Sequence, residues 1–100
     1  MTTTPSPGAV VVGIDDSDGG RRALDTAASE ALLSHRPLHV VHTWASYPTG
    51  YTAGAYPRTA TELADSIREY AASVLGAAVA RVREEHPTLQ VTDELAAGDA

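Results

Sequence analysis

The feature that most constrains this chain is a short apolar run that stops at a cluster of turn-forming and acidic residues. Residues 9–14 read Ala-Val-Val-Val-Gly-Ile, and such a continuous run is typical of a strand covered on both faces. The next six residues, Asp-Asp-Ser-Asp-Gly-Gly, favour a turn. Within them, Asp16, Ser17 and Asp18 are each suited to cap the N-terminus of a helix. The sequence therefore predicts a buried strand followed at once by a helix.

Helical and strand patterns then alternate along the chain. An apolar stripe predicts a helix over about residues 20–34, and Pro37 follows it. Residues 38–44 read as a second buried strand. The stripe consists of alanines and leucines at helical spacing: Ala23, Leu24, Ala27, Ala28, Ala31 and Leu32.

A stretch without periodicity follows at residues 45–58 and is expected to be a loop. A second helix and a third strand are predicted after it. Residues 59–62 form a capping-box sequence, Thr-Ala-Thr-Glu, which predicts the start of a long helix. Its expected apolar face is Leu63, Ile67, Tyr70, Ala71, Val74, Leu75, Ala78, Val79 and Val82. Pro87 ends the helix, and apolar residues alternate with polar ones over residues 89–95, as in a half-exposed strand. The order strand–helix–strand–helix–strand predicts a parallel α/β sheet with right-handed crossovers.

Composition limits the domain count and the classes of partner. With 100 residues the chain forms one domain, which we expect to comprise a flexible tail at residues 1–8 and a folded part at residues 9–100. A formal net charge of −6 argues against nucleic acid and anionic membranes as partners. There is no cysteine and no lysine, which excludes thiol and Schiff-base chemistry. The N-terminal residues do not resemble a secretory signal, so a cytoplasmic protein is expected.

The first strand-to-helix turn is the best candidate for chemistry. Its glycine spacing does not fit a dinucleotide fingerprint, and its carboxylates disfavour phosphate. An aspartate at a strand end is suited to accept hydrogen bonds from an exocyclic amine or a ribose hydroxyl. Helix capping accounts for residues 16–18 about as well as a functional role does, but it accounts less well for Asp15, which lies one step earlier.

These residues resemble the opening of a universal stress protein domain. The resemblance rests on Gly-Ile-Asp-Asp-Ser at residues 13–17, on the second strand ending in Thr43-Trp44, on the long helix after a loop, and on the strand leading to residues 97–99. It implies a Rossmann-like fold, similar to the adenine nucleotide alpha hydrolases. That fold has a parallel sheet of strand order 3-2-1-4-5 and helices on both faces. The chain matches the front two-thirds of such a domain, with strands 4 and 5 missing.

The resemblance also implies a function and site residues. It suggests a regulatory module of the stress response that binds an adenine nucleotide (ATP, ADP or AMP), with no reaction of its own and no metal. Asp15 would accept a hydrogen bond from the adenine or neighbouring groups, Gly13 and Ile14 would line the base, and Thr43 would contact it through its backbone. The family's glycine-rich phosphate loop follows the fourth strand, so only the nucleoside half of the site is expected here.

The first strand is also expected to find a protein partner. In the family order it lies between the second and fourth strands, so here one of its edges would be unpaired. Residues 10–12 are valines without a protecting lysine or proline. We therefore expect a homo-oligomer, such as a dimer, or another segment pairing along this edge.

Three alternatives remain open. Asp16 and Asp18 resemble the nucleophile and the acid/base of a Mg²⁺-dependent haloacid-dehalogenase phosphatase, although that family needs a lysine and a flap after the motif. The pair Asp15-Asp16 resembles a response-regulator receiver, which also needs a lysine. A stress protein that binds no nucleotide and acts through protein contacts is the third. His39 and His42 lie three apart on one strand and therefore point to opposite faces, which argues against a shared metal.

Overall fold

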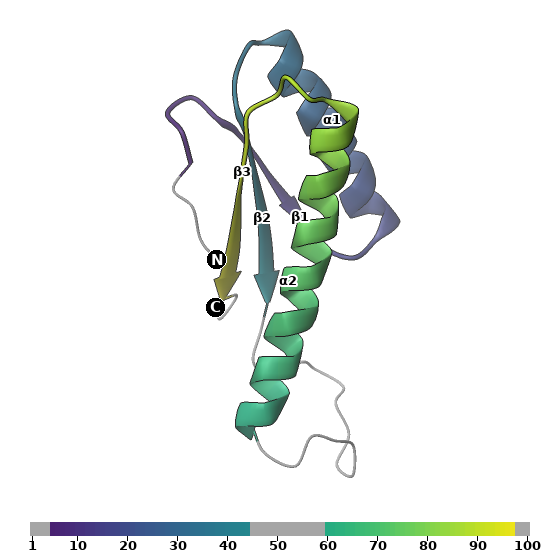
Figure 1. The fold of residues 1–100 in the computed structure, drawn as a ribbon, viewed down its shortest axis with the longest axis vertical. Coiled ribbons are helices and arrows are strands. Elements are labelled where there is room, and N and C mark those ends of the chain that lie inside the picture. Colours follow the sequence, from purple (N-terminus) through teal and green to yellow (C-terminus); the bar gives the residue numbers. More distant parts are fainter. Residues whose placement is uncertain (1–4, 45–59, 98–100) are drawn as a thin grey trace.

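The computed structural model describes residues 5–44 and 60–97. In chain order its elements are β1 (Val10–Ile14), α1 (Asp18–Leu33), β2 (Leu38–Trp44), α2 (Ala60–Glu85) and β3 (Val91–Ala97) (Figure 1). The sheet order is β1-β2-β3 and both strand pairs are parallel. The α/β class and the 3-2-1 part of the predicted order are thereby confirmed. The expected loop at residues 45–58 and the capping residue at position 59 lie outside the described residues.

Ser17 is the residue that caps α1, among the three candidates that the sequence left open. Its backbone is extended, and its hydroxyl accepts a hydrogen bond of 3.0 Å from the backbone N–H of Gly20. Asp18 begins the helix, where its negative charge favours the helix dipole. Of the predicted apolar stripe, Leu24, Ala28 and Ala31 are buried, whereas Ala23 is exposed.

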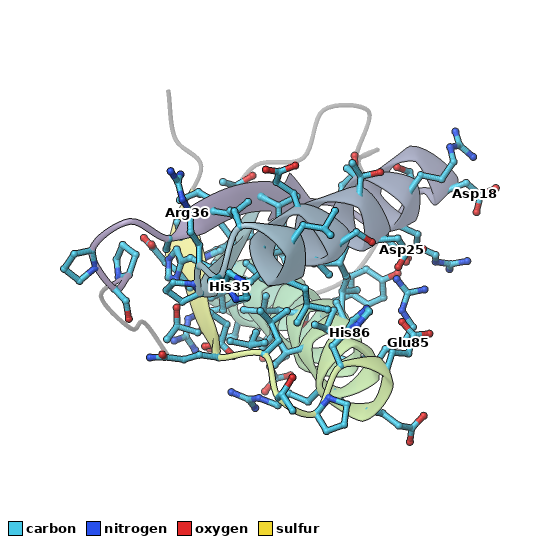
Figure 2. The ribbon with its side chains drawn as sticks, turned by 90° about the horizontal axis from the view of Figure 1, so that it is seen from above. Asp18, Asp25, His35, Arg36, Glu85 and His86 are labelled. Atoms are coloured by element: carbon cyan, nitrogen blue, oxygen red, sulfur yellow. The ribbon has the colours of Figure 1, made fainter. Side chains whose placement is uncertain are left out.

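Both described helices pack against the same face of the sheet, as Figures 1 and 2 show. The core between them and the sheet combines alternate strand residues with the inner faces of α1 and α2: Val12, Ile14, Leu24, Ala28, Ala31, Leu38, Val40, Ala71, Leu75, Val79, Val82, Leu89, Val91 and Leu95. Both helices lie on one face because the chain moves across the sheet in one direction, from β1 to β2 to β3, and each crossover is right-handed. Helices on the second face would follow from crossovers in the opposite direction, which the described residues do not contain.

α2 departs from its predicted apolar face at one aromatic residue. Ala71, Leu75, Val79 and Val82 are buried as expected. Tyr70 is instead 59% exposed, because its hydroxyl reaches toward the end of β1. Among the described residues, no helix combines the length and the apolarity needed to cross a membrane.

The sheet face opposite the helices carries a polar network that the sequence did not reveal. His39 is buried, and its two ring nitrogens lie 2.7 Å from Thr92 Oγ1 and 3.1 Å from Glu94 Oε1. Val11, which pairs with His39 in the register, is 61% exposed. Cross-strand hydrogen bonds to Thr92 and Glu94 thus allow a polar ring to be buried on this face.

Candidate functional site at the carboxyl end of the sheet

Asp15 follows the last residue of β1 and is held by the first turn of α1. Its Oδ1 accepts a hydrogen bond of 3.1 Å from the Ser17 backbone N–H and a second one from the Ser17 hydroxyl. The Ser17 hydroxyl therefore links the N–H of Gly20 to the Asp15 carboxylate. Both hydrogen bonds from the described residues end on Oδ1, which leaves Oδ2 able to accept from a ligand.

Gly20 makes this arrangement possible, since α1 approaches the backbone of Asp15 closely there. A Cβ at position 20 would lie 2.6 Å from Asp15 Oδ1, 3.0 Å from its carbonyl oxygen and 3.1 Å from its nitrogen. Only glycine fits such a close approach. The Gly19-Gly20 pair signalled a turn in the sequence, but the sequence could not show that the second glycine is the one in contact.

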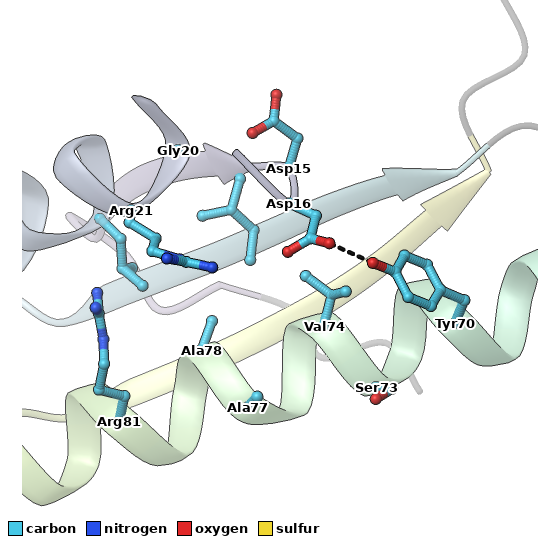
Figure 3. A pocket seen from close by; sticks show the side chains of 12 residues that line it. Asp15, Asp16, Gly20, Arg21, Tyr70, Ser73, Val74, Ala77, Ala78 and Arg81 are labelled. Carbon is cyan, nitrogen blue, oxygen red and sulfur yellow. Dashed lines mark hydrogen bonds between the residues drawn. The ribbon is translucent and has the colours of Figure 1, made fainter. Parts of the chain in front are cut away.

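The four predicted site residues do not all face the same side of the sheet. Gly13 and Thr43 are exposed on the face away from the helices, and a Cβ at position 13 would have nothing within 4 Å. Ile14 is instead buried on the helix side, because successive strand residues point to opposite faces. Ile14 can therefore contribute only its backbone to a site that includes Gly13 and Thr43. In Figure 3 the Asp15 carboxylate points away from α2.

Asp16 turns in the other direction and joins the end of β1 to α2. Its Oδ2 accepts a hydrogen bond from the Tyr70 hydroxyl (Figure 3). This pairing across the fold was missed in the sequence, where Tyr70 fits the apolar spacing of α2 and Asp16 fits a helix cap. The amphipathic nature of tyrosine, with an apolar ring and a polar tip, was the only signal for it.

Hydrogen bonds at this site shift the pKa values of Asp15 and Tyr70 in opposite directions. The side-chain hydrogen bond from Ser17 lowers the pKa of the Asp15 carboxyl below its ordinary value. The hydrogen bond from Tyr70 to Asp16, together with the charge of that carboxylate, raises the pKa of the Tyr70 phenol. Asp15 therefore stays an acceptor at neutral pH, and Tyr70 stays a donor.

The two histidines of β2 lie on opposite faces, as predicted, and their surroundings differ. His42 is buried on the helix side. Its Nδ1 is the buried side-chain polar atom that has no hydrogen-bond partner in the described part of the chain. Over residues 5–44 and 60–97, no group of three or more His, Asp or Glu residues could hold a metal ion.

Replacing Ser17 by alanine tests how the first turn controls Asp15. Ser17→Ala removes the helix cap, so we expect the free energy of unfolding to fall by about 1 kcal/mol at pH 7. We also expect the pKa of Asp15 to rise, because the carboxylate loses its main hydrogen bond. A lowered pKa in the folded state stabilises the fold above the unfolded pKa, and this contribution is lost as the pH falls. The stability loss should therefore be smaller at pH 3 than at pH 7.

Urea unfolding at both pH values and an NMR titration of the Asp15 carboxyl carbon would measure these effects. Ser29→Ala, at an exposed position in the middle of the same helix, is the matched control and should leave both quantities nearly unchanged. An Asp15 pKa that does not move in Ser17→Ala would contradict the role assigned to Ser17.

Comparison with known proteins agrees with this fold. The model of the universal stress protein family matches residues 8–100. A crystal structure of a protein from this family from Burkholderia pseudomallei is 25% identical with a TM-score of 0.70, covering 96% of this chain and 68% of that one. A universal stress protein from Archaeoglobus fulgidus is 28% identical with a TM-score of 0.53, covering 92% and 59%.

A third solved structure, a universal stress protein in complex with cAMP, is 23% identical with a TM-score of 0.58. It covers 91% of this chain and 61% of that one, so this chain spans 59–68% of the length of these three neighbours. None of the curated proteins matches the chain. Because the family match extends over nearly all of the sequence and the solved neighbours share its fold, the chain belongs to the universal stress protein family.

Proposed function

We propose that this chain binds the nucleoside part of an adenine nucleotide at the carboxyl end of β1 and acts as a regulatory module in the cytoplasm, without catalysing a reaction. The observation that carries the proposal is the Asp15 carboxylate, which Ser17 orients through Oδ1 while Oδ2 can still accept. A carboxylate oxygen is a strong acceptor for an exocyclic amine or a ribose hydroxyl. The cAMP complex of a structural neighbour supports a nucleotide as the ligand.

The surroundings of Asp15 suit the flat ring of a purine. Gly13 has no side chain and leaves open space on the face away from the helices, so a ring can approach the backbone there. Thr43 is exposed on the same face at the end of β2. This is the edge of a parallel sheet at which α/β proteins commonly bind ligands.

The acidic first turn determines which part of the nucleotide binds. Asp15, Asp16 and Asp18 lie at or just before the N-terminus of α1, where a phosphate would otherwise be attracted. Their charges oppose a phosphate at this point, so the base and ribose are the parts held. We therefore expect the triphosphate of ATP to add little affinity compared with AMP.

Calorimetry with AMP, ATP, cAMP and GMP would test this proposal. We expect AMP to bind weakly, with Kd roughly in the millimolar range, and GMP to bind less well because its exocyclic amine lies elsewhere on the ring. Asp15→Asn should weaken AMP binding by about tenfold, since a charge-assisted hydrogen bond is lost.

Asp18→Asn is the matched control, because it removes one charge at the same helix end from a side chain that is 84% exposed. It should not weaken AMP binding, because its charge opposes the phosphate and makes no contact with the base or ribose in the proposed site. Equal losses in both variants would mean that only the general charge matters. No binding of any nucleotide would refute the proposal and favour the alternative of a stress protein that acts through protein contacts.

The partner proposed for this fold is a second copy along β1. In the described part of the chain β1 is an edge strand, and Val11 is 61% exposed on it. Such an edge offers unpaired backbone groups to another strand. We expect light scattering at high protein concentration to give a mass above that of one chain. Val11→Lys should return it to the monomer, and a wild-type monomer would exclude this pairing.

A further inference from the structure

A groove of about 280 Å³ lies between α1 and α2, on the helix side of β1 (Figure 3). Small residues from both helices, including Gly20, Ala77 and Ala78, leave this space open. The groove borders the proposed nucleoside site at Ile14 and Asp15, which also line it. It differs from that site in its other residues, because Gly13 and Thr43 face the other side of the sheet and the Asp15 carboxylate points away from α2.

One end of the groove is acidic. Asp16 lines it together with Tyr70, whose hydroxyl donates to Asp16 Oδ2. That hydrogen bond fixes the direction of the carboxylate, and its Oδ1 can accept from a ligand. A cation placed at Oδ1 would meet the negative charge of this carboxylate.

The other end is basic. Arg21 and Arg81 both line it, and in Figure 3 both side chains lie on the side of Asp16 opposite Tyr70. Arg81 Nη2 forms a hydrogen-bonded ion pair of 2.7 Å with Asp25, which neutralises its charge. Among the described residues, Arg21 makes only a longer contact of 3.6 Å with Asp18, and both of these side chains are largely exposed. Most of the five N–H donors of Arg21 therefore remain available.

The floor between the two ends is apolar. Ile14 and Leu24 are buried beneath the groove, and Val74 and Ala78 pack against the same core from α2. A methylene chain lying on this floor would be removed from water. The groove thus presents an acceptor, an apolar surface and a donor in that order.

We propose that the groove between α1 and α2 binds a zwitterionic small molecule with its ammonium group at Asp16, its carboxylate at Arg21 and its carbon chain on the apolar floor. A simple anion is disfavoured by Asp15, Asp16 and Asp18 near the groove. A simple cation would leave the donors of Arg21 without an acceptor. A zwitterion satisfies both ends and adds no net charge to a chain that is already acidic.

NMR titration of the full chain with ω-amino acids from 4-aminobutanoate to 8-aminooctanoate would test this site, with hexylamine and hexanoate as probes that carry a single charge. We expect one chain length to shift the backbone amides of the groove residues, and both single-charge probes to bind at least about tenfold more weakly. No shift for any probe at about 20 mM, equally strong binding of hexylamine, or shifts confined to Gly13 and Thr43 would each overturn the proposal.

Two variants and a neighbouring control locate the charges. Arg21→Gln and Asp16→Asn should each weaken binding of the best zwitterion by about tenfold. Arg22→Gln, at an exposed neighbouring position outside the groove, should not. AMP binding should be the same in Arg21→Gln as in the wild type, so failure of this site and failure of the nucleoside site are separate results. Equal loss of zwitterion binding in Arg21→Gln and Arg22→Gln would overturn the assignment.

Discussion

Leu24→Ala is expected to lower the free energy of unfolding by about 3–5 kcal/mol. The Leu24 side chain is 1% exposed and belongs to the core between α1 and the sheet. Its truncation removes apolar contacts and leaves a cavity that rigid neighbours fill only in part. Domains of this size are stable by roughly 5–15 kcal/mol, so a large fraction of the molecules could unfold under mild conditions.

Leu33→Ala is the matched control, because it makes the same chemical change in the same helix. The Leu33 side chain is 81% exposed, and surface substitutions of this kind change stability by about 0.5 kcal/mol or less. Urea unfolding followed by circular dichroism would measure both variants. If the two lost equal stability, α1 would have to pack by a different face from the one described here.

Gly20→Ala is expected to destabilise the fold by about 1–2 kcal/mol and to disturb Asp15. The new Cβ would lie 3.0–3.1 Å from Asp15 backbone atoms and 2.6 Å from its Oδ1. Overpacking of this kind costs about 1–3 kcal/mol, which exceeds the gain in helix propensity of up to about 1 kcal/mol. Because the carboxylate must move, AMP binding should weaken in parallel.

Two other glycines serve as controls for this substitution. A Cβ at Gly19 would meet only Ser17 Oγ at 3.8 Å, an ordinary contact, and a Cβ at Gly76 would have nothing within 4 Å. Gly19→Ala should be close to neutral. Gly76→Ala, in the middle of α2, should raise stability by about 0.5–1 kcal/mol. A stabilised Gly20→Ala protein with normal AMP binding would show that α1 does not approach Asp15 this closely.

Strand and helix positions followed largely from local patterns. The second strand was predicted over residues 38–44 and β2 is Leu38–Trp44. The first helix was expected from about residue 20 and begins at Asp18. The two extra residues precede the apolar stripe, and the helix includes them because Ser17 caps it. Periodicity identifies the face that a helix buries, but several adjacent polar residues can each serve as its cap.

Side-chain pairings between distant segments could not be read in the same way. Tyr70 fits the spacing of the buried face of α2, yet its hydroxyl bonds to Asp16 across 54 positions of sequence. His39 is separated by 53 positions from Thr92 and by 55 from Glu94, its partners on β3. These contacts depend on the strand register and on where α2 lies against β1. Neither property can be predicted from the spacing of residues that are close together in the sequence.

The sequence by itself determined the order of strands and helices and the parallel α/β class, because these depend on local spacing and on turn chemistry. Only the tertiary structure decided which way each carboxylate of the first turn faces. The Asp15 carboxylate points away from α2, whereas Asp16 accepts a hydrogen bond from Tyr70 of α2. The direction of Asp16 depends on Tyr70, which is 54 positions away in the sequence, so it is set by the packing of α2 near the end of β1.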